Sequence, residues 1–121
     1  MEAIEKSGHK DTVRIGLDCA SSEFYNAEEK KYDLSWKTGT KDRLLNATEF
    51  IDLYEDLTKN FPIVSFEDPF DQDDFEAYAA MQTRIGSSTQ IVGDDLLVTN
   101  PKRVRTGIEK KLCNALLLKV N

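Results

Sequence analysis

Four short apolar runs in this chain each end in a charged residue, and this recurrence constrains the fold more than any other feature. The runs cover residues 13–18, 63–67, 90–94 and 115–119, and they end at Asp18, Glu67, Asp94 and Lys119. Runs of this length between turn signals are typical of buried strands. Because the carboxyl ends of parallel strands meet at one edge of a sheet, we expect the four charged side chains to lie together there.

The segments between the runs have the periodicity of helices. Asn46 is followed three positions later by glutamate and then by an apolar stripe, which is typical of a capped helix. Asp73 repeats the capping signal, and Asn100 followed by proline begins a third helix. The resulting order of strand, helix, strand, helix, strand, helix, strand predicts an α/β fold with parallel strands and right-handed crossovers.

The first crossover is longer than the others and contains an insertion. Residues 23–37, which are rich in aromatic side chains, are expected to form a long loop or a small hairpin before the first long helix. Because strand side chains alternate between faces, the residues two positions before the four charges should share their face. These residues are Gly16, Ser65, Val92 and Leu117.

Composition limits the class of protein. The chain has 121 residues, enough for one modest domain, and its net charge of -6 argues against binding to nucleic acid or to an anionic membrane. No apolar stretch is long enough to span a bilayer, and no secretory signal is visible at the start. Cys19 and Cys113 lack metal-site spacing and are expected to be free, buried thiols, which fits a reducing, cytoplasmic setting.

The three carboxylates suggest a metal site. Asp18, Glu67 and Asp94 offer oxygen ligands without histidine or cysteine, a set that suits a hard cation such as magnesium or manganese. Each carboxylate taken singly could instead be solvated or cap the next helix. Asp95 either faces the opposite side of the sheet or turns inward and hydrogen-bonds a site residue.

Lys119 follows three leucines, so its ammonium needs a partner if the strand is buried. Burial and a nearby divalent ion would both favour the neutral amine, which could then act as a general base. The alternative is a lysine whose stem packs on the strand while its ammonium reaches water.

Four stretches of the sequence resemble the enolase family. They are GLDCASSEF at 16–24, SFEDPF at 65–70, GDDL with VTNP at 93–101, and LLLKVN at 116–121. The similarity covers nearly the whole chain, in the order and at the spacing typical of the family. It implies about four consecutive strand-helix units of a (β/α)8 barrel, with residues 1–121 forming part of the C-terminal barrel domain.

The resemblance also implies an activity, the reversible magnesium-dependent dehydration of 2-phosphoglycerate to phosphoenolpyruvate. Asp18, Glu67 and Asp94 match the carboxylates that hold the metal ion, and Lys119 matches the base that removes the proton alpha to the carboxylate. Glu67, Asp94 and Lys119 would then contact the substrate, and Asp95 would support the site from beside it. Enzymes of this superfamily typically use a lysine or histidine base together with one or two magnesium ions. Full-length family members are typically cytoplasmic homodimers.

Parts of the family pattern fall outside the chain. The glutamate that protonates the leaving hydroxyl would lie upstream of Met1, and the arginine, histidine and serine that bind phosphate would also lie outside the 121 residues. A complete barrel takes about 250 residues. We therefore expect an internal fragment that lacks the N-terminal domain and the rest of the barrel. Alone, it should be inactive and should fold poorly, because its outer strands would have unpaired edges.

Two alternatives stay open at this point. The first is another superfamily enzyme, such as a racemase or cycloisomerase, although the loop at residues 21–24 and the Asp94-Asp95 pair favour enolase itself. The second is a truncated, non-catalytic product that acts only in binding or dimerisation.

Overall fold

The computed structural model describes residues 1–120, and its main element is a four-stranded sheet. The strands are β1 (Ile15–Asp18), β5 (Ile63–Glu67), β6 (Gln90–Gly93) and β7 (Ala115–Leu116). They lie side by side in the order β1-β5-β6-β7, and every neighbouring pair is parallel. The predicted α/β class, with parallel strands joined by helical crossovers, is confirmed.

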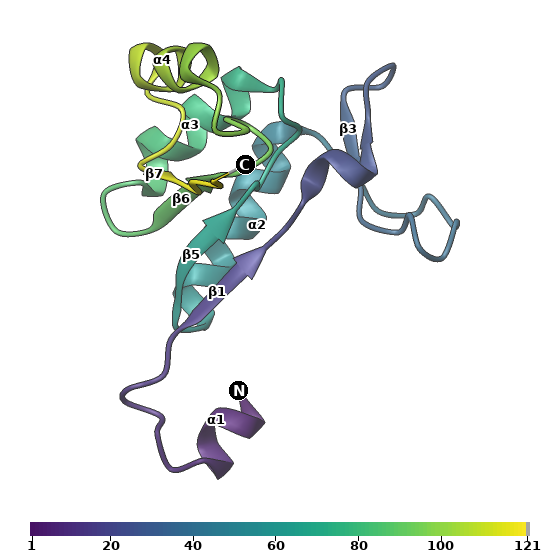
Figure 1. Ribbon diagram of the computed structural model, residues 1–121. Helices are drawn as coiled ribbons and strands as arrows, with labels where there is room; N and C mark the ends of the chain where they lie inside the picture. The colour runs from purple at the N-terminus through teal and green to yellow at the C-terminus, as the bar shows by residue number, and fades with distance from the viewer. Residues whose placement is uncertain (121) are drawn as a thin grey trace.

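Three helices connect these strands and lie against the sheet (Figure 1). They are α2 (Ala47–Asn60), α3 (Phe75–Ile85) and α4 (Pro101–Lys110). A fourth helix, α1 (Glu2–Lys6), is short, has no buried residue and stands apart below β1 in Figure 1. It was not predicted. No helix within residues 1–120 has both the length and the apolar character needed to cross a membrane.

The insertion in the first crossover forms a small sheet of its own. After the short helix η1 (Ser21–Phe24), three antiparallel strands follow in the order β2-β3-β4. Their bounds are β2 (Tyr25–Asn26), β3 (Lys31–Asp33) and β4 (Leu44–Leu45). Of the two predicted forms, the hairpin is therefore confirmed, and it gains a third strand.

Three of the predicted strands were too long, and β6 differs least, since it ends at Gly93 rather than at Asp94. β1 begins at Ile15 because the first hydrogen bond of its ladder is donated by the Ile15 N–H. The acceptor is the carbonyl of Pro62, the residue directly before β5. β7 ends at Leu116, although the next N–H, that of Leu117, still donates to Gly93 at 3.1 Å. Lys119 therefore lies beyond the strand rather than at its last residue.

The cap of α3 was placed one residue early. Asp74 is the N-cap, and its carboxylate accepts a hydrogen bond from the N–H of Ala77. The carboxylate of Asp73 is instead paired with Arg103 at 3.0 Å. The caps predicted at Asn46 and Asn100 are confirmed.

The two faces of the sheet differ as the alternation predicts. On one face, neighbouring strands place three apolar residues in register: Leu17, Phe66 and Ile91. The last two are fully buried. Gly16 and Ser65 pair on the opposite face, as do Asp18 and Glu67. That face of β1 is exposed, because the helices that build the core pack on the other side. The two cysteines are free and half-buried.

An aromatic cluster forms the centre of the core. Phe70 is fully buried, and its ring contacts those of Tyr32, Phe50, Tyr54 and Tyr78 at centroid distances of 5.5 to 5.8 Å. All four pairs have the edge-to-face geometry that aromatic rings prefer. The cluster ties the small sheet, α2 and α3 to the loop that follows β5, so it supports the carboxyl edge of the main sheet.

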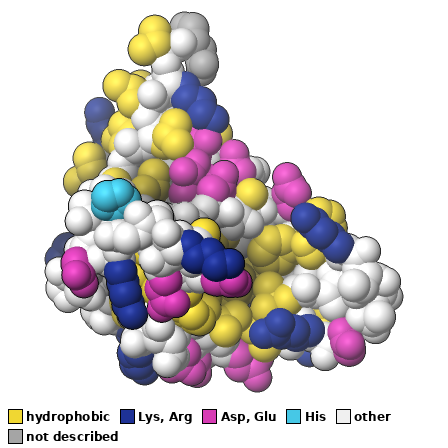
Figure 2. Space-filling model, turned by 90° about the horizontal axis from the view of Figure 1, so that it is seen from below, with side chains coloured by type: hydrophobic (Ala, Val, Ile, Leu, Met, Phe, Trp, Pro, Cys, Tyr) yellow, Lys and Arg dark blue, Asp and Glu magenta, His cyan; other side chains and the backbone are white. Residues whose placement is uncertain are grey.

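Some apolar surface remains uncovered. Viewed from the side on which α1 lies, hydrophobic side chains are exposed between groups of charged ones (Figure 2). Exposed large apolar residues on the whole molecule include Val13, Phe61, Val64, Ile108 and Leu118.

Replacing Phe70 by alanine is expected to lower the free energy of unfolding by about 3–5 kcal/mol, because a fully buried ring with four aromatic neighbours is lost. Thermal or urea unfolding, followed by circular dichroism in a full-length enolase that carries residues 1–121, measures this loss. Phe61→Ala is the matched control, since the Phe61 side chain is 42% exposed. An effect of Phe70→Ala no larger than that of the control would contradict the central role of the cluster.

Candidate metal centre

The strand register brings two of the predicted carboxylates to one edge of the sheet. Glu67, the last residue of β5, is level with Asp18 on β1 and with Val92 on β6. Asp94 follows two residues after Val92, so it lies on the same face but one step further along. Such a progressive stagger is what tilted strands of a barrel produce.

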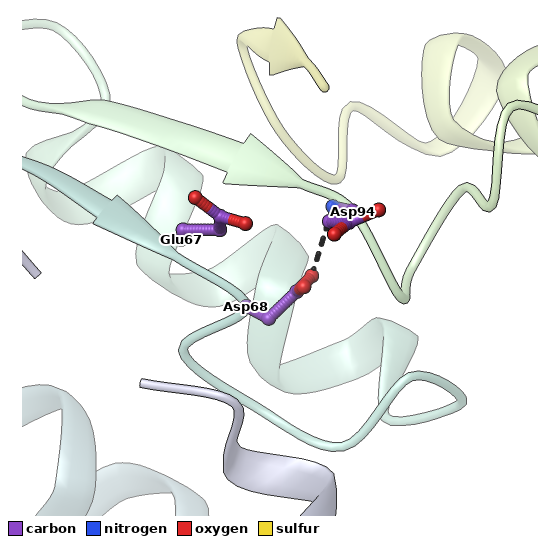
Figure 3. Close-up of side chains that lie close together, drawn as sticks. All are labelled: Glu67, Asp68 and Asp94. Carbon is purple, nitrogen blue, oxygen red and sulfur yellow. Dashed lines mark hydrogen bonds between the residues drawn. The ribbon is translucent and has the colours of Figure 1, made fainter. Parts of the chain in front are cut away.

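Glu67 and Asp94 form a close acidic group with a third residue, Asp68. Within residues 1–120, one carboxylate oxygen from each of the three lies within 4.8 Å of the others. Figure 3 shows Glu67 at the end of β5, Asp94 just after β6, and Asp68 between them with its carboxylate directed at the Asp94 backbone. Glu67 and Asp94 are half-buried, whereas Asp68 is only 2% exposed.

Asp18 lies beside this group but is not one of its three members. It is exposed, and its carboxylate accepts a hydrogen bond from the N–H of Ala20 at 3.2 Å. Its charge still reaches Glu67, where it is the first of the neighbouring charges that raise the pKa of that carboxyl. Asp18 is thus placed on the strand next to Glu67, while its side chain is turned toward its own loop.

Lys119 is paired with Asp94. Its Nζ lies 2.6 Å from Asp94 Oδ2, and its own N–H donates to Thr99 Oγ1 at 3.0 Å. The Lys119 side chain is 53% exposed, so its ammonium both reaches water, as one of the two alternatives expected, and pairs with Asp94. The hydrogen bond to Asp94, together with the charges of Asp94, Asp95 and Glu67, raises the pKa of the Lys119 amine.

The carboxyl groups repel one another. Loss of solvent raises the pKa of Glu67 most, followed by the charges of Asp18, Asp68 and Asp94, and only Lys119 acts in the opposite direction. The pKa of Asp95 is raised in the same way, by loss of solvent and then by Asp68 and Asp94. The site therefore holds more negative charge than one lysine compensates, which suits a divalent cation.

Asp95 contributes through its backbone. β6 ends at Gly93, so the strand does not continue and no longer fixes the face of Asp95. Its N–H donates to Asp68 Oδ2 at 2.8 Å, while within residues 1–120 its carboxylate makes no hydrogen bond. The two arrangements predicted for Asp95 concerned its side chain, whereas the contact seen here is made by its backbone N–H.

Asp68 belongs to the acidic group although it was not among the site residues predicted from the sequence. A signal was present, since a second carboxylate directly after Glu67 falls on the opposite, helix-covered side, where a charge needs partners. Those partners are the N–H groups of Asp94, Asp95 and Leu96, which lie on the next loop.

Comparison with known proteins identifies the family of the chain. A model of the family described as "Enolase, C-terminal TIM barrel domain" matches residues 1–121. The chain is 55% identical over 123 residues to an enolase of Eimeria tenella, covering 100% of this chain and 28% of that protein. It is 54% identical over 121 residues to an enolase of Solanum lycopersicum, covering 98% of this chain and 27% of that relative. The chain therefore belongs to the enolase family, with the fold of part of the C-terminal TIM barrel domain.

Proposed function

We propose that this chain supplies the metal-binding carboxylates and the base lysine of an enolase, which reversibly dehydrates 2-phosphoglycerate to phosphoenolpyruvate. The proposal covers the whole protein's activity, because the chain spans 28% of the length of its Eimeria tenella relative. The observation that carries it is the contact of Lys119 with Asp94 beside Glu67, at the carboxyl edge of a parallel sheet. The names of both relatives support the same reaction.

Magnesium is the proposed cation. Asp18, Glu67 and Asp94 would hold it, and the absence of histidine or cysteine from the acidic group fits a hard ion with oxygen ligands. Asp18 is level with Glu67 on the neighbouring strand, and its carboxylate would have to leave the N–H of Ala20 to bind the same cation. When bound, the cation would offset the negative charge that develops on the substrate carboxylate.

Lys119 is proposed to move the proton. The contact with Asp94 raises the pKa of Lys119, and a cation bound to Asp94 would offset that carboxylate charge and favour the neutral amine. In the neutral form, Nζ would accept the proton from the carbon alpha to the substrate carboxylate. Glu67 and Asp94 lie beside that amine, and so the three side chains would border the substrate together. Asp94 also limits where the amine can point, because the two groups are in direct contact.

The alternatives are less well supported. A racemase or cycloisomerase would share the superfamily fold, but both relatives at 54–55% identity are named enolases. A non-catalytic binding product would not require an amine held 2.6 Å from a half-buried carboxylate at a strand edge. Homodimer formation and a cytoplasmic location stay predictions.

The test needs a full-length context. Residues 1–121 would replace the matching segment of the Solanum lycopersicum relative, and we call the product the exchange enolase. It is expected to convert 2-phosphoglycerate to phosphoenolpyruvate, followed by absorbance of the product, and to lose that activity when magnesium is chelated. The isolated 121 residues are expected to show no turnover under the same conditions.

Two results would contradict this proposal. One is a folded exchange enolase that neither binds magnesium nor turns over substrate. The other is turnover that persists unchanged after the metal has been removed, since the acidic group would then have no part in the reaction.

A further inference from the structure

Asp68 is buried beside the proposed metal ligands, yet it has no assigned role. Its carboxylate accepts hydrogen bonds from three consecutive backbone N–H groups, those of Asp94 at 3.1 Å, Asp95 at 2.8 Å and Leu96 at 3.4 Å. A fourth bond comes from the hydroxyl of Tyr78 at 3.3 Å. Three of these bonds end on Oδ1 and the bond from Asp95 ends on Oδ2, so Oδ1 has no free acceptor position.

We propose that Asp68 is a positioning residue, whose carboxylate fixes the turn after β6 and thereby aims the Asp94 side chain at the cation and at Lys119. The inference rests on the proposed function, because it assigns Asp68 a role in that same site. Asp68 itself is not proposed as a ligand. One of its oxygens lies within 4.8 Å of one oxygen each of Glu67 and Asp94, but the carboxylate is directed at the backbone of the turn (Figure 3).

The turn that carries Asp94 depends on an external acceptor. β6 ends at Gly93 and α4 begins only at Pro101. The N–H groups of Leu97, Val98 and Asn100 donate to carbonyls within the turn, whereas those of Asp94, Asp95 and Leu96 donate to the Asp68 carboxylate. Leu96 is 1% exposed, which means that its N–H cannot rely on water. The Asp68 carboxylate satisfies these donors, and charge-assisted bonds of this kind are stronger than neutral ones.

Asp68 is itself held from three sides. Its N–H donates to the Val92 carbonyl of β6 at 3.0 Å, and its carbonyl accepts from the N–H of Ser21 at 3.1 Å. Its φ of +43° lies in the left-handed region, which a residue other than glycine seldom adopts without such support. The residue is therefore a rigid link between the loop after β1, the end of β6 and helix α3.

The test is Asp68→Asn in the exchange enolase. The amide matches the carboxylate in size, but one oxygen becomes an NH2 group that faces backbone donors, so at least one N–H of the turn loses its acceptor. We expect the dissociation constant for Mg²⁺, measured by isothermal titration calorimetry without substrate, to rise about 10- to 100-fold. We expect the activation constant for Mg²⁺ to rise by the same factor.

Tyr78→Phe is the matched control. It removes one hydrogen bond from the same carboxylate on the side of the core and leaves the turn after β6 untouched. It should lower thermal stability while changing the Mg²⁺ dissociation constant by less than about twofold. If Asp68→Asn behaves like this control, with lower stability and unchanged Mg²⁺ binding, the positioning role is wrong and Asp68 is only structural.

A second measurement needs no variant, which matters if Asp68→Asn does not fold. Metal binding at Asp94 should stabilise the turn that Asp68 anchors, because coupling between two sites is reciprocal. Amide exchange at Asp95 and Leu96 in the unsubstituted exchange enolase should therefore slow several-fold on addition of Mg²⁺. Unchanged exchange at both amides, in protein that calorimetry shows to bind Mg²⁺, would overturn the inference.

The two proposals fail in different ways. An unsubstituted exchange enolase that folds but neither binds Mg²⁺ nor acts on 2-phosphoglycerate counts against the proposed function. An unsubstituted protein that does both, with an Asp68→Asn variant whose Mg²⁺ binding is unchanged, counts against the role of Asp68 alone.

Discussion

Replacing Lys119 by alanine is expected to lower kcat of the exchange enolase about 10³-fold at saturating Mg²⁺, because the group proposed to accept the substrate proton is removed. The side chain is 53% exposed and, among residues 1–120, makes its ion pair with Asp94 alone, so its removal leaves no cavity in the core. Far-ultraviolet circular dichroism and the thermal midpoint should therefore stay close to those of the parent. Initial rates over a range of substrate and Mg²⁺ concentrations measure the effect.

The affinity of Lys119→Ala for Mg²⁺ distinguishes the role of Lys119 as a base from a role in holding the metal site together. Lys119 places a positive charge 2.6 Å from Asp94 Oδ2, and that charge competes with a cation for the same carboxylate. Without it, Mg²⁺ should bind to Lys119→Ala as tightly as to the parent or more tightly. A loss of activity that comes from a damaged metal site would instead weaken Mg²⁺ binding together with kcat.

Lys102→Ala is the matched control for this experiment. Lys102 is exposed on the first turn of α4 and has no ion pair among residues 1–120. Its replacement should leave kcat and Mg²⁺ binding within about twofold of the parent. A kcat of Lys119→Ala within about tenfold of the parent would show that Lys119 is not the base.

The parallel sheet could be predicted because its cause is local. Each strand is a short apolar run, and each helix begins at a polar cap such as Asn46 or Asn100 whose side chain accepts a nearby backbone N–H. These signals lie within four residues of the feature that they specify. Errors of one or two residues, as at the start of β1 or at the cap of α3, arose where a tertiary contact decided the boundary.

The site was harder to predict because its contacts are distant in sequence. The Asp68 carboxylate accepts hydrogen bonds from three N–H groups that lie 26 to 28 positions further along the chain. Contacts between residues so far apart leave no periodic pattern in the sequence. The choice between a buried and an exposed Lys119 stayed open for a related reason. Three leucines are compatible with a buried strand, but within residues 1–120 β7 pairs with β6 alone and ends three residues before the lysine.

Replacing Glu67 by glutamine should produce the second large effect, a loss of affinity for Mg²⁺. The amide keeps the size of the side chain but removes a negative charge from the centre of the acidic group. Mg²⁺ binding to the exchange enolase should weaken about 100-fold, which corresponds to about 2.7 kcal/mol. Glu109→Gln, which changes an exposed glutamate of α4, is the control and should leave Mg²⁺ binding unchanged.

The stability of Glu67→Gln should change in opposite directions with and without the metal. In the metal-free protein, the charges of Asp18, Asp68 and Asp94 and the loss of solvent raise the pKa of Glu67, so its ionised form opposes folding at neutral pH. A neutral amide relieves that repulsion, and the metal-free thermal midpoint should be equal to or higher than that of the parent. With Mg²⁺ present, the parent gains stability by mass action in proportion to its tighter binding, so it should exceed the variant. A variant that is less stable than the parent without metal, yet binds Mg²⁺ equally well, would mean that Glu67 supports the fold and does not hold the cation.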